Sequence, residues 1–62
     1  MTIDDILDNI RSLALSQGFY GRLYRTLMEI REYEPESWIS VVSELEGQHF
    51  HDAVDMVLYF EA

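Results

Sequence analysis

The stretch Ser16-Gln17-Gly18-Phe19-Tyr20-Gly21-Arg22-Leu23 separates two amphipathic segments of this chain. Gly18 follows the last apolar position of the first segment, where helices commonly end in the left-handed conformation that glycine adopts most easily. Phe19 and Tyr20 come next, so the corner itself carries aromatic side chains. We therefore expect two helices that meet at a tight turn, with Gly18 as a left-handed cap.

Upstream of this turn, the sequence predicts a helix over residues 3–16. Thr2 and Asp5 have the spacing of a capping pair, and the acidic residues of the first turns suit the positive end of the helix dipole. Apolar residues recur every three or four positions, which gives the segment one apolar face. These residues are Ile3, Ile6, Leu7, Ile10, Leu13 and Ala14.

Downstream of the turn, the same periodicity predicts three more helices, over about 19–33, 35–46 and 48–60. Pro35 separates the second helix from the third, because proline disfavours helical geometry in the residue before it and suits the first position of a new helix. Gly47 is the matching stop signal after the third helix. The apolar sets of the last two helices are Trp38, Val41, Val42 and Leu45, and Phe50, Ala53, Val54, Val57 and Leu58.

The predicted fold class is all-α: a compact bundle of four short helices joined by tight turns, in a single domain over residues 1–62. Sixty-two residues are enough for one domain only. Gly21 lies inside the second helix, where glycine costs about 1 kcal/mol relative to alanine. We expect this cost to be offset by the close approach of the first or the fourth helix.

The charge of the chain is its strongest compositional feature. Twelve carboxylates face four arginines, for a net charge of -8, and lysine and cysteine are absent. Such a chain repels phosphate backbones and attracts basic partners. It has no run of about 18 apolar residues that could span a membrane. The acidic N-terminus lacks the basic region of a signal peptide, so we expect a cytoplasmic protein.

The residue types that carry catalysis or bind metals do not form a recognisable site. His49, His51, Asp52 and Asp55 have metal-ligand chemistry, but on a helix no single face collects three of them. The serines lack a glycine elbow, and no lysine follows the glycines of the turn. We therefore expect a protein that is not an enzyme, with no catalytic residue, no metal and no cofactor.

Eight aromatic rings exceed what so small a core easily buries. Since tyrosine, tryptophan and arginine dominate interface hot spots, we expect a non-enzymatic accessory protein that binds another protein, or itself as a homodimer, through an aromatic and arginine surface. The homodimer would bury residues 57–60 and the corner 19–20 and leave the acidic face of the first helix in solvent. The candidate interaction residues are Phe19, Tyr20, Arg22, Arg25, Tyr33, Trp38, Tyr59 and Phe60.

Two other functions are compatible with the same residues. Residues 3–33 could form a helix-turn-helix-like pair of a nucleic-acid-associated regulator, with Arg22 and Arg25 on the second helix. Two arginines are a small basic footprint, and the net charge of -8 disfavours direct nucleic-acid binding. The acidity fits either a mimic of nucleic acid that occupies a basic partner or a net charge that keeps a small, aromatic-rich protein in solution.

Two stretches, Ser16-Gln17-Gly18-Phe19-Tyr20-Gly21-Arg22-Leu23 and Leu45-Glu46-Gly47-Gln48-His49-Phe50-His51-Asp52-Ala53-Val54-Asp55, together resemble small uncharacterised proteins encoded by phages and prophages of Gram-positive bacteria. The resemblance covers nearly the whole chain. It implies an accessory protein that acts in the host cytoplasm on a host or phage factor. It transfers no catalytic or binding residue.

Overall fold

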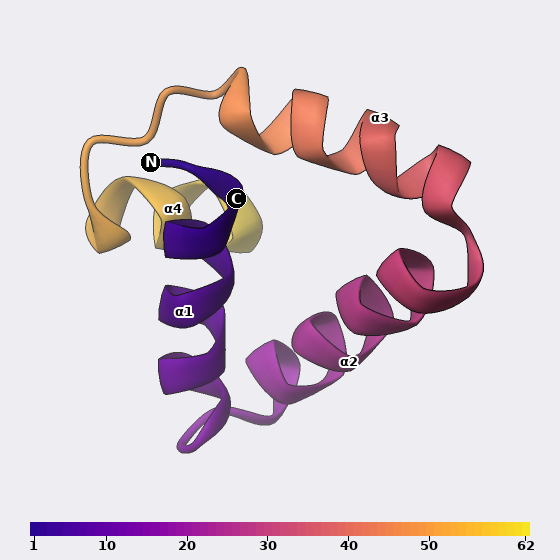
Figure 1. Cartoon of the computed structure of the whole chain (residues 1–62). Helices are drawn as coiled ribbons and strands as arrows, with labels where there is room; N and C mark the ends of the chain where they lie inside the picture. Colours follow the sequence, from indigo (N-terminus) through magenta and orange to yellow (C-terminus); the bar gives the residue numbers. More distant parts are fainter.

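The computed structural model describes all 62 residues and contains four helices and no strand (Figure 1). The helices are α1 (Ile3–Ala14), α2 (Gly18–Tyr33), α3 (Pro35–Glu46) and α4 (Ala53–Glu61). The prediction of an all-α bundle of four helices is therefore confirmed. None of these helices combines the length and the apolar character that a membrane crossing requires.

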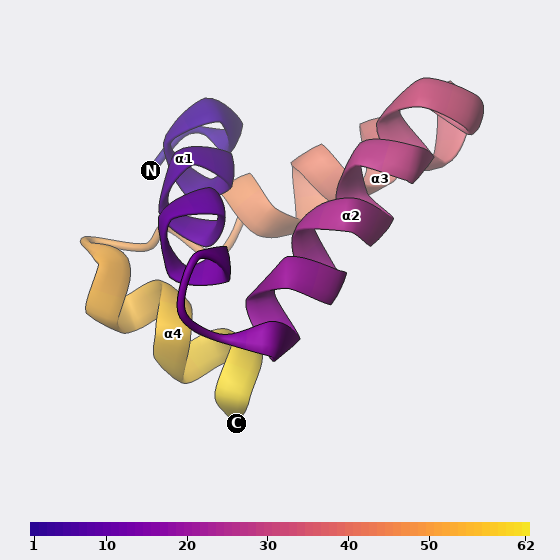
Figure 2. The same ribbon diagram turned by 90° about the horizontal axis from the view of Figure 1, so that it is seen from below.

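The other three helices are arranged around α1. α2 leaves the turn after α1 and diverges from it, α3 returns across the open end of this V, and α4 crosses α1 (Figures 1 and 2). α2 makes the most extensive contact with α1, and α1 is the one helix whose backbone α4 approaches. The corner between α2 and α3 therefore lies at the opposite end of the molecule from α4 in both views.

The turn between α1 and α2 is one residue longer than the sequence predicts, and it begins two residues earlier. α1 ends at Ala14 rather than residue 16, and Gly18 is already the first residue of α2. The amides of Ser16 and Gln17 both donate to the Leu13 carbonyl, at 3.1 and 3.0 Å. These bonds satisfy the Leu13 carbonyl, one of the free carbonyls of the helix end, without a left-handed residue, and no glycine of the chain has a positive φ. The prediction of a left-handed cap at Gly18 is wrong.

Eight side chains form the core. α1 supplies the largest share, with the centre of its predicted apolar face, and α2 adds Tyr20 and Leu27. The accessible surface of 4367 Å² is close to the roughly 4,200 Å² expected for a folded monomer of this mass. The single chain is therefore as compact as an ordinary monomer. The core consists of Ile6, Leu7, Ile10, Tyr20, Leu27, Leu45, Phe50 and Met56.

α4 begins five residues later than the predicted start at residue 48. Residues 47–52 form a connection in which His49 adopts a positive φ of 53° and Phe50 enters the core. Asp52 caps α4, and its carboxylate accepts the Asp55 amide at 3.0 Å. A helix that started at residue 48 would not leave the chain free to place Phe50 in the core and Asp52 at the cap position.

The rotation of α4 also differs from the prediction. Val54 and Leu58, expected to face inward, are each 64% exposed, whereas Met56 is fully buried. Because Met56 faces α1, the residues two positions away on either side are turned to solvent. The close approach predicted at Gly21 is not found. The Ala14 carbonyl oxygen of α1 lies 4.0 Å from the position of a Cβ there, which is an ordinary contact distance that leaves room for alanine.

Candidate functional site

The solvent-exposed face of α2 carries an ordered row of charges. Arg22, Arg25, Glu29 and Glu32 are all exposed, and their spacing of three, four and three residues follows the helical repeat. With 3.6 residues per turn, the four side chains lie within about 80° of one another around the helix axis. Tyr20 and Leu27 face the core on the opposite side. We call these four residues the α2 charge row.

The order of these charges opposes the local preferences of a helix. The macrodipole favours carboxylates near the N-terminus and cations near the C-terminus, yet the first turn of α2 contains no acidic residue and Glu32 lies in the last turn. A glutamate also pairs better with a cation four residues later than four residues earlier, and here Arg25 precedes Glu29. The arrangement is therefore not explained by the stability of α2.

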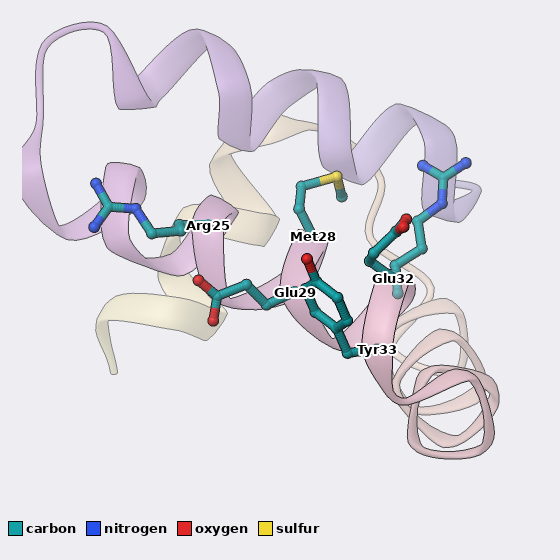
Figure 3. A pocket seen from close by; sticks show the side chains of 6 residues that line it. Arg25, Met28, Glu29, Glu32 and Tyr33 are labelled. Carbon is teal, nitrogen blue, oxygen red and sulfur yellow. The ribbon is translucent and has the colours of Figure 1, made fainter.

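The C-terminal half of this face contains a shallow hollow of about 460 Å³ beside an exposed ring (Figure 3). Tyr33, the last residue of α2, is 79% exposed. A second hollow at the α2–α3 corner also has Tyr33 in its wall, together with residues 34–37. The ring therefore stands between two depressions that are open to solvent. The first hollow is lined by Arg25, Met28, Glu29, Arg31, Glu32 and Tyr33.

The predicted interaction residues do not form one surface. The α2 face brings together Arg22, Arg25 and Tyr33, while Tyr20 is fully buried in the core and cannot contact a partner. Its inclusion in the predicted surface is therefore wrong, because the inward side of α2 faces α1 at this position. Phe19 lies in the first turn of α2 and is 44% exposed.

The remaining predicted aromatics pack mainly against the core. Trp38 on α3 and Phe60 on α4 are half-buried. Tyr59 is 39% exposed and makes edge contacts with Phe50 and Phe60, with ring centroids 5.4 and 5.1 Å apart. The surplus of aromatic rings that the composition indicates is thus largely absorbed by these contacts.

Glu29 and Glu32 are absent from the predicted interaction residues. The signal that identifies them is present in the sequence: they continue the spacing of Arg22 and Arg25 along one helical face and reverse its sign. Finding them requires knowledge that this face is free of tertiary contacts. That knowledge comes from the packing of α2 against α1 and α3.

Tyr20 has an unusual hydroxyl. The side chain is fully buried, and the hydroxyl oxygen has no hydrogen-bond partner. Burial raises the pKa of Tyr20 above its usual value, and the negative charge of the nearby Glu61 carboxylate raises it further. Because the buried hydroxyl has no hydrogen-bond partner, it is held in the core at a cost in free energy.

The residues with metal-ligand chemistry stabilise the start of α4. The Asp55 carboxylate accepts the His51 amide at 3.0 Å, and the Asp52 carboxylate accepts the Asp55 amide at the same distance. Both carboxylates are thus used by the helix cap. No group of three or more histidine and carboxylate side chains is placed to hold a metal ion.

No protein-family model, curated protein or solved structure matches this chain. The resemblance to phage-encoded proteins stays a prediction. The function is therefore inferred from the residues and geometry of α2 and its neighbours.

Proposed function

We propose that this chain is a non-enzymatic accessory protein that binds another protein, or a second copy of itself, through the exposed face of α2. The observation that carries the proposal is Tyr33, which is 79% exposed at the end of that face and borders two hollows. Tyrosine and arginine are enriched among the residues that dominate binding energy in protein interfaces. We place its action in the cytoplasm, and in the host cytoplasm for a phage-encoded protein.

The shape of the site favours a protein partner over a small molecule. Small ligands bind in concave pockets that enclose most of their surface. The hollow beside Tyr33 is lined by residues of a single helix, so it is an open surface depression that cannot enclose a small ligand. A partner side chain could lie against the ring while its neighbours pair with Arg25 and Glu29.

Affinity capture with matched variants tests this proposal. Immobilised wild-type protein is compared with Tyr33→Ala and Arg25→Ala on α2, and with Ser12→Ala on the exposed side of α1 as a control. We expect partners that the wild type and the control retain and that both α2 variants lose. Equal retention by all four proteins, each folded by circular dichroism, would contradict the assignment of the binding face to α2.

A nucleic-acid-associated regulator is the second candidate. The observation that favours it is the exposure of Arg22 and Arg25 on one face. Glu29 and Glu32 continue the same face and would repel phosphates, which weakens this candidate. Fluorescence anisotropy with duplex DNA at low and moderate salt separates the two. Affinity that falls steeply with salt and is lost in Arg22→Ala would support DNA binding.

The acidity of the chain supports a related possibility for the partner. Asp4, Asp5 and Asp8 are exposed on α1, away from its buried face. A basic partner that normally binds nucleic acid would be attracted to this surface. DNA added to the captured complex should then displace the partner, whereas a complex held by the α2 face alone should persist.

A further inference from the structure

We propose that the partner of the α2 face is a second copy of this chain, paired antiparallel along α2. The inference rests on the proposed function and names the partner of that same face. It follows from the symmetry of the α2 charge row.

The row is symmetric about position 27. Arg25 and Glu29 lie two residues before and after it, and Arg22 and Glu32 lie five residues before and after it. A two-fold axis perpendicular to α2, at the level of position 27 and on the exposed side of the helix, would place each arginine of the row opposite a glutamate of the second copy. Two-fold contacts are self-complementary by construction, so the same two kinds of pair form twice.

The free state of these side chains supports an intermolecular role. The side-chain hydrogen bonds of the structure involve other residues, mainly at the two capped helix starts. The order of charges in the row also opposes both the helix dipole and the favoured direction of pairing within a helix. In an antiparallel dimer the same order of charges is favourable, because each arginine then lies opposite a glutamate of the other copy.

The charge of the whole chain selects this face for self-association. Two copies, each with a net charge of -8, repel unless their contact avoids acidic surfaces. The α2 charge row contains two cations and two anions, so its own net charge is zero. The exposed side of α1, with Asp4, Asp5 and Asp8, lacks this balance.

The length of α2 and its terminal ring are suited to such a contact. Its 16 residues span about 24 Å, longer than any other helix here, and Tyr33 adds apolar surface at each end. Exposed ion pairs are individually weak, and salt screens both these pairs and the repulsion between the two acidic copies, so we expect a weak, reversible dimer. The sequence-based prediction placed the dimer contact at residues 57–60 and 19–20 instead.

The competing face for self-association is the outer side of α4. Val54 and Leu58 are exposed there, at the opposite end of the molecule from the α2–α3 corner. These two residues offer apolar surface without any charge pattern that selects a partner. Leu58→Glu, a variant of this outer side of α4, therefore distinguishes the two possible contacts.

A charge-swap experiment tests the antiparallel dimer. Arg25→Glu puts two glutamates opposite each other in its own homodimer, and Glu29→Arg puts two arginines there. Each variant alone should associate at least about tenfold more weakly than wild type in sedimentation equilibrium at low salt. An equimolar mixture of the two should regain wild-type association, because every charge then meets its opposite. The pair Arg22→Glu and Glu32→Arg provides an independent repeat.

Three results would overturn the inference. The first is a wild-type chain that stays monomeric at all concentrations and at low salt. The second is a mixture of the folded charge-swap variants that stays monomeric. The third is a dimer that persists in Arg25→Glu but is lost in Leu58→Glu, which would place the contact on α4. Capture of a different protein that depends on Tyr33 would still support the proposed function in each case.

Discussion

Glu46 holds the start of α1 from the far end of α3, and its removal gives the sharpest test of the fold. Its carboxylate accepts the Ile3 amide at 2.8 Å, across 43 positions of sequence. Ile3 is the first residue of α1, so its amide has no partner within the helix. Glu46 thus caps α1 from another helix, in addition to the local capping box of Thr2 and Asp5.

The expected cost of Glu46→Ala can be worked from this geometry. A hydrogen bond to a charged group contributes about 1.5–3 kcal/mol. Glu46 is half-buried, so water screens part of that interaction and we take the lower limit, about 1.5 kcal/mol. For a domain of this size, such a loss lowers the melting temperature by roughly 6–12 °C.

Circular dichroism during thermal and urea unfolding measures this loss, with Glu44→Ala as the matched control. Glu44 and Glu46 both lie in the last turn of α3, where the helix dipole disfavours carboxylates, so both variants remove a charge of the same unfavourable kind. Glu46→Gln keeps an acceptor oxygen and should fall between wild type and Glu46→Ala. Equal unfolding midpoints for Glu44→Ala and Glu46→Ala would refute the role of this bond.

Three further predictions concern the stability of variants at single positions. Tyr20→Phe removes the buried hydroxyl and should stabilise the fold by about 1 kcal/mol in urea melts. The pKa of Tyr20 is raised above 10.0 in the folded state, so the free energy of unfolding of wild type should fall as the pH rises from 10.0 through the folded pKa. The phenylalanine variant has no hydroxyl to ionise and should lose less stability over the same pH range. Gly21→Ala should stabilise α2 by about 0.5–1 kcal/mol, since its Cβ would lie 4.0 Å from the Ala14 carbonyl oxygen; a lower melting temperature would contradict this. Asp52→Ala should cost about 1 kcal/mol and Asp52→Asn much less, and equal melts for both would show that Asp52 does not cap α4.

The starts of α1 and α4 show how far local sequence patterns reach. Thr2 and Asp5 predict the start of α1 correctly because a capping box involves only neighbouring residues. Asp52 and Asp55 have the same spacing and do cap α4, but the apolar residues before them also fit a longer helix. The structure shows that the shorter helix forms: α4 starts at Ala53, and Phe50 enters the core from the connection that precedes it.

The candidate site was predictable in part. Arg22 and Arg25 are expected at a surface because they lie off the apolar face of the second helix. Tyr33 ends that apolar face in the sequence, and the structure shows that it is exposed. Tyr20 has the same aromatic character, and only the contact of α2 with α1 shows that its ring is buried. The significance of Glu29 and Glu32 depends equally on which side of α2 stays uncovered.

The sequence by itself determined the four helices, most of their ends and the acidic outer face of α1, because propensity, capping and periodicity act over a few residues. The tertiary structure alone decided the rotation of α4, the burial of Tyr20, the path of residues 47–52 and the bond from Glu46 to Ile3. Each of these depends on contacts between residues far apart in the chain. Local patterns do not fix such contacts, because close packing requires the side chains of different helices to fit together at the same time.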